Sequence, residues 1–322
     1  FFFSAVFTQF LYYYFIDWLR NPITGVSRQL IETQARAIAI GCVTVGCILG
    51  AVITAGFRDG SIALEKLATM AARYRDEMIA YGDETALFPI RSSRQVILNL
   101  MGRSLDPIKL EGEEITSLEE FKAGRLDQHP MAETILTTMP LMLACFFHDL
   151  DTALPLAIKN TDMWKSDFPA YLSIFYPFFR CLIWASLYKR EKERRFKKFF
   201  KRDSSEFERW SKAGSPNGVV LLSTLKAESK AVFESDRGTD HVQVVKELYE
   251  TAIKANDEFG FRHFAALTAE RRAGRHFMSL GHNEDALTFS KLAIERYQEW
   301  GAMGKVQQVE DEFGHLRRGN TP

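Results

Sequence analysis

The sequence lacks the short motifs that mark common nucleotide, metal and redox sites. It contains no G-x-x-x-x-G-K-[ST] phosphate loop, so this chain should not hydrolyse a nucleotide by itself. The dinucleotide fingerprint G-x-G-x-x-G, the zinc-protease motif H-E-x-x-H and the redox motif C-x-x-C are absent as well. We therefore expect no catalytic residue, no metal site and no cofactor in this chain.

An excess of charge of either sign is also missing, because 41 basic residues balance 41 acidic ones. Such a chain has no overall field to attract nucleic acid or an anionic membrane, so neither is an expected partner. Cysteines are few and lie in apolar surroundings, which indicates buried thiols in a reducing, cytoplasmic compartment. They are Cys42, Cys47, Cys145 and Cys181. The chain begins without methionine, and we expect it to be part of a longer protein.

Alternation of apolar and polar residues with a period of two is lacking along the whole chain, so the sequence predicts no sheet. An apolar share of 46% with 25% charged residues is typical of a folded globular protein. The prediction is an all-α fold. We divide it into helical regions at 1–116, 117–214 and 215–316, followed by a frayed tail at 317–322.

One run without any charge, Ala37 to Phe57, is 21 residues long and meets the length criterion for a membrane span. It is rich in glycine and other small residues, and is therefore only weakly hydrophobic per residue. Small-residue faces occur in packed transmembrane helices and also suit close packing inside a soluble helical protein. We favour a buried core helix, with a membrane span as the alternative.

Helix boundaries are expected where glycine, proline and capping residues cluster. Ser61 is a candidate N-cap for a helix at 62–81. Gly82 to Pro89 should break the chain before another helix from Arg94 to Met101.

The central part of the sequence suggests one loop and two further helices. Residues 102–116 contain Gly102, Pro107 and Gly112 and are expected to form the longest irregular piece. Ser117 and Glu120 fit a capping box for a short helix. An apolar helix at 131–147 should follow, and the aromatic segment from residue 168 should continue as one long helix to residue 210.

The C-terminal region repeats itself with a shift of 41 residues. Glu247 to Phe261 aligns with Leu287 to Ala302, so that Ala252 falls on Ala293 and Gly260 on Gly301. Repetition at such a spacing is typical of helical repeat proteins. Phe259 falls on Trp300 in the same alignment.

Between the two copies lies a helix-turn-helix pattern of the tetratricopeptide type. A small residue, an aromatic, a turn glycine and two more small residues occur at the offsets that this repeat prefers. They are Gly274, Phe277, Gly281, Ala286 and Ala293. Small residues let paired helices approach closely. The pattern predicts an α-solenoid of stacked helix pairs, and we assign its packing to these five residues together with Ala252, Gly260, Trp300 and Gly301.

The segment Lys189 to Arg202 carries nine basic and two acidic residues, interleaved with phenylalanines. It could contact nucleic acid, an anionic lipid surface or a calmodulin-type partner. The simpler interpretation, which we prefer, is a helix whose aromatic stripe is buried and whose lysines form its solvated outer face.

The isolated histidines and aspartates favour structural roles. His276 and His282 are six residues apart with a turn glycine between them, a poor spacing for zinc ligands. Asp149 or Asp151, after His148, is expected to cap the next helix.

Residues 94–113 (RQVILNLMGRSLDPIKLEGE) and 300–306 (WGAMGKV) carry a family resemblance. The chain resembles the tetratricopeptide-like helical region of large signalling proteins. In those proteins this region follows an AAA-type ATPase domain, often precedes a GAF domain and a sensor histidine kinase, and commonly shares the chain with a serine/threonine-kinase-like domain. One departure is the polar insertion at 235–241, which is longer than the expected turn.

The resemblance implies a non-catalytic scaffold that relays signals within a larger ATPase or kinase. Its expected partners are the nucleotide-binding ATPase, GAF or kinase domains of the same polypeptide, together with other proteins. The alternative is a membrane-associated helical protein that uses residues 37–57.

Overall fold

The structure is a computed structural model that describes residues 2–123, 132–159, 171–234 and 238–318. Every regular element within these ranges is helical, which confirms the all-α prediction for them. The α-helices are α1 (Phe2–Leu11), α2 (Val26–Ala39), α3 (Val43–Thr54), α4 (Leu64–Tyr81), α5 (Glu84–Leu100), α6 (Leu118–Lys122), α7 (Ala132–Phe147), α8 (Leu150–Lys159), α9 (Phe175–Glu191), α10 (Arg194–Lys212), α11 (Pro216–Phe233), α12 (Thr239–Glu258), α13 (Arg262–Leu267), α14 (Arg275–Ser279), α15 (Asn283–Trp300) and α16 (Met303–Arg318).

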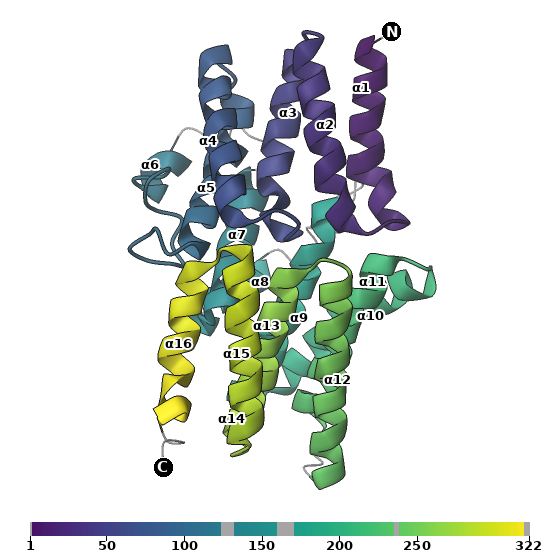
Figure 1. Ribbon diagram of the computed structural model, residues 1–322, viewed down its shortest axis with the longest axis vertical. Coiled ribbons are helices and arrows are strands. Elements are labelled where there is room, and N and C mark those ends of the chain that lie inside the picture. Colours follow the sequence, from purple (N-terminus) through teal and green to yellow (C-terminus); the bar gives the residue numbers. More distant parts are fainter. Residues whose placement is uncertain (1, 124–131, 160–170, 235–237, 319–322) are drawn as a thin grey trace.

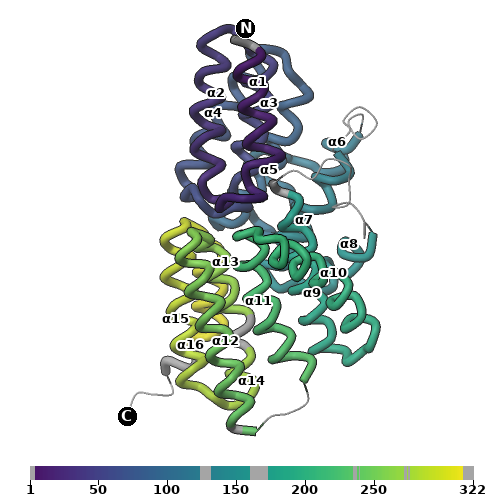
Figure 2. Tube along the Cα trace, turned by 90° about the vertical axis from the view of Figure 1, so that its right-hand side faces the viewer, coloured from purple at the N-terminus to yellow at the C-terminus, as the bar shows by residue number. Residues whose placement is uncertain are grey.

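The helices form two blocks stacked along the long axis of the molecule. The N-terminal block, α1 to α5, lies above the C-terminal block, α12 to α16, and the middle helices α7 to α11 lie beside and behind the latter (Figure 1). Figure 2 shows the same stacking from the side, with α7 at the level where the blocks meet. Consecutive helices pack against each other in both blocks, and buried apolar side chains form one continuous cluster through the molecule.

The uncharged run 37–57 is not one helix, which corrects the expectation of a single core helix. Gly41 adopts a left-handed backbone with φ of +76°, a conformation that costs little only for glycine. The N–H groups of Gly41 and Cys42 donate to the carbonyls of Ile38 and Ala37 and close the end of α2. The chain therefore reverses, and α3 packs back against α2.

The α3 helix comprises 12 residues, and the short 3₁₀ helix η4 (Ala55–Arg58) follows it. Across the described ranges, no helix combines the length and the apolar character needed to cross a membrane.

Two boundaries near α4 and α5 differ from the expectation. Ser61 does not cap α4, because the helix begins only at Leu64. The N–H of Ser61 donates instead to the carboxylate of Asp59, at 2.8 Å. The expected break at 82–89 is shorter than predicted. Asp83 caps α5 by accepting from the N–H of Ala86 at 2.9 Å, and Pro89 lies inside the helix.

The expected helix from 168 to 210 is in fact a hairpin of two helices. Lys192, with φ of +60°, ends α9, and α10 folds back along α9 and α11. Three aromatic side chains of α10 are buried in this packing: Phe196, Phe200 and Phe207. The basic residues Lys198 and Lys201 are exposed, as the buried-stripe interpretation predicts.

Some boundaries agree with the sequence, and others fall outside the described residues. Ser117 caps α6 by accepting from the N–H of Glu120 at 3.3 Å, as expected. The carboxylate of Asp149 accepts from the N–H of Thr152 at 3.0 Å and caps α8. The start of the helix expected from 168, residues 235–237 of the polar insertion and the tail at 319–322 lie outside the described ranges.

Replacement of Lys192 by glycine tests the hairpin. Glycine adopts the left-handed backbone without the Cβ penalty, so Lys192→Gly should raise the free energy of unfolding by about 0.5–1 kcal/mol. Urea unfolding measures the change. The matched control, Lys198→Gly, removes an exposed lysine from the middle of α10 and should lower stability by about 1 kcal/mol. A loss of stability in both variants would mean that the chain is helical through residue 192.

Candidate functional site

The two turns of the predicted repeat lie where the blocks meet. Gly260 and Gly301 follow α12 and α15 with φ of +81° and +90°. Both face the N-terminal block, because a Cβ on Gly260 would lie 3.5 Å from Thr24 and one on Gly301 would lie 3.6 Å from Leu64. The hydroxyl of Thr24 also donates to the Phe259 carbonyl at 2.9 Å. These glycines thus reverse the chain and also let the two blocks approach.

The other predicted packing residues lie in or beside the C-terminal block. A Cβ on Gly274 would lie 3.6 Å from the carbonyl oxygen of Ala286, so these two residues are neighbours. The remaining side chains are fully or almost fully buried: Ala252, Phe277, Ala286, Ala293 and Trp300. Gly281 forms a turn with φ of +79°, and nothing lies within 4 Å of the position a Cβ would take there.

The start of α11 ties the middle helices to the N-terminal block. Asn217 is fully buried, and its side-chain oxygen accepts from the N–H of Ile23 at 2.9 Å. Its side-chain nitrogen donates to the carbonyls of Trp18 and Asn21 at 2.6 and 2.9 Å. A buried amide with these partners fixes the chain that enters α2 against α11.

The C-terminal block caps the end of α7. The last carbonyls of a helix have no partner within it, and their partial negative charge favours cations. Lys305 donates to the Phe146 carbonyl at 2.7 Å, and Gln308 donates to the Phe147 carbonyl at 3.0 Å. Arg271 donates to the Cys145 carbonyl. Three side chains from η7 and α16 therefore hold three successive carbonyls of α7.

The cation of Lys305 is balanced inside the protein. Its ammonium lies 3.0 Å from the carboxylate of Glu270, and both side chains are fully buried. The hydroxyl of Tyr297 donates to the other oxygen of Glu270 at 2.9 Å. Burial of a charged pair is tolerated when hydrogen bonds satisfy both partners, and this pair connects α15, α16 and η7 to the end of α7.

Glu270 and Arg271 both belong to a π-helical segment, η7 (Thr268–Gly274), which joins α13 to α14. Arg271 reaches away from Glu270 and donates to His148 at 2.7 Å and to Ser186 at 3.2 Å. Segments of π-helix are rare and occur often at functional sites. Here the side chains of two consecutive charged residues in the segment contact different helices.

A polar face of α5 holds the loop 102–116. Gln95 and Asn99 are fully buried, although they lie in a helix whose neighbouring residues are largely apolar. Gln95 accepts from the N–H of Glu114 at 3.0 Å, and Asn99 donates to the carbonyls of Pro107 and Lys109 at 3.2 and 2.6 Å. These bonds substitute for the backbone pairing that a loop lacks.

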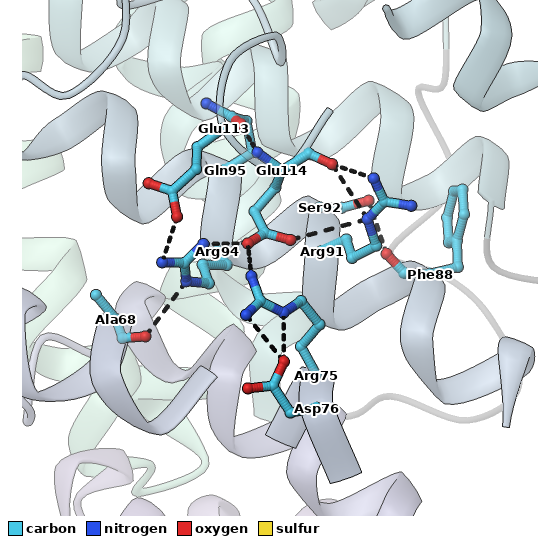
Figure 3. A network of polar contacts seen from close by, with 10 residues as sticks. All are labelled: Ala68, Arg75, Asp76, Phe88, Arg91, Ser92, Arg94, Gln95, Glu113 and Glu114. Atoms are coloured by element: carbon cyan, nitrogen blue, oxygen red, sulfur yellow. Dashed lines mark hydrogen bonds and ion pairs between the residues drawn. The ribbon is translucent and has the colours of Figure 1, made fainter. Parts of the chain in front are cut away.

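Three guanidinium groups, the arginine cluster of Arg75, Arg91 and Arg94, converge on Glu114 from α4 and α5 (Figure 3). Arg75 binds the Glu114 carboxylate at 2.5 Å, and Arg91 lies 3.8 Å from its other oxygen. Arg94 forms an ion pair with the same carboxylate and a second one with Glu113 at 2.8 Å. The Glu114 side chain is only 2% exposed, so these contacts form largely out of water.

The charges around Arg75 strengthen its protonated form. Burial lowers the pKa of Arg75, but hydrogen bonds and charges from Asp76 and Glu114 outweigh it and raise that pKa above its ordinary value. The guanidinium therefore remains a permanent cation of the cluster.

The loop 102–116 also touches the C-terminal block. Gly102 and Gly304 face each other so closely that a Cβ on Gly304 would lie 3.0 Å from the Gly102 nitrogen and 3.1 Å from the Asn99 oxygen. Since Lys305 follows directly, the contact lies beside the capped end of α7. A continuous set of contacts thus runs from Glu114 through this glycine pair to Glu270.

Two buried ionisable groups lie where η4 meets α13. Nε2 of His263 donates to the Arg58 carbonyl at 2.8 Å, and burial lowers the pKa of His263 to about 3. Ser27 donates to the carboxylate of Asp59 at 2.6 Å. Burial nevertheless raises the pKa of Asp59 to about 6, because its hydrogen bonds only partly offset the desolvation.

The sequence does not predict the burial of these polar residues. One available signal is the spacing of Arg91, Gln95 and Asn99, which places three polar residues on one face of a helix just before a loop. Glu270, Arg271 and Lys305 give no such signal, because charged residues are normally exposed.

No protein-family model and no curated protein matches this sequence. Functional inference therefore rests on the residues and contacts of the chain itself. In the site described above, charged groups bind each other and backbone carbonyls, an arrangement that positions helices and a loop.

Replacement of Glu114 by glutamine tests the loop anchor. Glu114→Gln keeps the shape but removes the charge that three guanidinium groups share, and should lower the free energy of unfolding by about 2–3 kcal/mol. This value is below that for a fully buried pair, because the Arg75 and Arg91 side chains are 27% and 29% exposed. Glu65→Gln is the control, since its pair with Arg103 is exposed, and it should cost less than about 1 kcal/mol. Equal losses in urea unfolding would contradict a special role for Glu114.

The two buried ionisable groups predict opposite pH effects between pH 4 and pH 6. The folded state raises the pKa of Asp59, so its contribution to stability is largest at low pH and is lost as the pH rises towards 6. The folded state lowers the pKa of His263, so its contribution is present above about pH 6.5 and is lost as the pH falls towards 3.

Single variants separate the two effects. On acidification from pH 6.5 to 4, the free energy of unfolding of Asp59→Asn should fall by up to about 3 kcal/mol relative to that of the natural sequence. The reason is that asparagine cannot take up the proton that stabilises the folded state at Asp59. Over the same range, the free energy of unfolding of His263→Gln should rise relative to that of the natural sequence, because glutamine is not protonated on unfolding. Urea midpoints measured across this pH range provide the test, and parallel curves for all three proteins would show that neither group has a shifted pKa.

Proposed function

We propose that this chain is a non-catalytic helical scaffold, an α-solenoid of stacked helix pairs related to tetratricopeptide repeats. It would connect other domains of a larger cytoplasmic signalling ATPase or kinase and relay changes between them. The expected partners are the ATPase, GAF or kinase domains of the same polypeptide, together with further proteins. The sequence resemblance at 94–113 and 300–306 supports this setting.

The observation that carries the proposal is the capped end of α7. Arg271, Lys305 and Gln308 come from the C-terminal block, yet they satisfy carbonyls of a helix that also packs on α5. A displacement of the C-terminal block therefore strains its buried polar contacts with α7, which packs on α5 of the N-terminal block. This favours a stiff connector over two independent units.

Hydrogen exchange in the full-length protein tests the relay. Binding of a nucleotide to the neighbouring ATPase domain should change amide exchange along α12 to α16 and also in the loop 102–116. The Gly304→Ala variant should remove the response in the loop, because a Cβ there meets the backbone of Gly102.

Gly314→Ala is the matched control, since Gly314 lies in the same helix and a Cβ there meets nothing within 4 Å. Its exchange response should equal that of the natural sequence. Exchange along α12 to α16 that is identical with and without nucleotide would refute the relay. A parent chain without any ATPase or kinase domain would refute the setting.

A further inference from the structure

The arginine cluster carries more positive charge than the buried carboxylate at its centre can neutralise. Glu114 is the acidic group at its centre, whereas Asp76 and Glu113 on its outer side have side chains that are 66% and 57% exposed. Water and salt screen those two carboxylates. One monovalent carboxylate therefore faces three guanidinium groups (Figure 3).

The anion of this site is carried by a loop, and the cations are carried by helices. Arg75 lies on α4, and Arg91 and Arg94 lie on α5, whose packing against each other is part of the core. Loops open at a lower free energy than packed helices. When the loop 102–116 moves away, the three cations remain close together, and their mutual repulsion favours entry of another anion.

A phosphoryl group matches this site better than a carboxylate does. It carries a charge of about −2 at pH 7 and three acceptor oxygens, and guanidinium forks bind such oxygens in pairs. The side chains of Arg75 and Arg91 are 27% and 29% exposed, so a group from solvent can reach them. Phosphoryl groups on proteins are commonly recognised by clusters of arginine.

We propose that the arginine cluster is a binding site for a phosphate monoester, and that Glu114 occupies it in this structure as a built-in competitor. Binding of the phosphoryl group displaces Glu114 and loosens the loop 102–116. The loop meets α16 at Gly102 and Gly304, so its release reaches the start of α16. The proposal does not depend on the nature of the parent protein.

Titration with inorganic phosphate at constant ionic strength tests the site, with binding followed by calorimetry. Glu114→Gln should bind phosphate at least about tenfold more tightly than the natural sequence, because the competing carboxylate is gone. Glu193→Gln, which removes the carboxylate of an exposed arginine pair outside the loop 102–116, should bind as the natural sequence does. Adding Arg91→Gln to the Glu114→Gln protein should abolish the gain. Equal affinity of the Glu114→Gln and natural proteins would overturn the proposal.

If Glu114→Gln does not fold, hydrogen exchange of the natural sequence tests whether phosphate displaces the loop. Saturating phosphate should raise amide exchange at residues 103–116 and leave α12 unchanged. Unchanged exchange in the loop would overturn the proposal.

A phosphoserine peptide and its unphosphorylated form identify the source of the group. Tighter binding of the phosphopeptide than of inorganic phosphate indicates a protein ligand, equal binding indicates a small phosphate, and binding of neither overturns the site.

Discussion

The buried end of α7 is the constraint on which the rest of the structure depends. Its last carbonyls face the interior, where water cannot satisfy them, and an unpaired buried carbonyl is costly. The C-terminal block supplies their partners through Arg271, Lys305 and Gln308. The positions of η7 and α16 relative to the middle helices follow from this requirement. Lys305 in turn requires Glu270, since an uncompensated charge would not be stable there.

The same logic operates at the loop 102–116, which has no regular backbone pairing of its own. Buried polar side chains of α5 supply partners for its carbonyls and N–H groups, and the arginine cluster holds its carboxylate. Buried ion pairs add little net stability when desolvation is included. Their effect here is to fix position, because each group accepts only a neighbour of opposite charge in a defined place.

The glycine turns at Gly260 and Gly301 both end a helix and allow close contact between the blocks, and glycine suits both roles because it has no side chain. Gly260 and Gly301 take left-handed backbone conformations that end their helices. The missing side chain also allows close contact with the N-terminal block, at Thr24 and Leu64. The glycine turn that occurs in both copies of the sequence repeat therefore also forms part of the contact between the two blocks.

The sequence by itself determined the helical class, most helix positions and the locations of several caps, because these depend on neighbouring residues. Periodicity, the capping serine at 117 and the glycine turns act within a few residues of each other. The tertiary structure alone decided where α9 ends, how residues 37–57 fold, and which charges are buried. Lys192, Glu114 and Lys305 look like ordinary surface residues in the sequence. Glu114 finds its partners on α4 and α5, and Lys305 binds the carbonyl of Phe146, 159 residues away, and no local pattern encodes such contacts.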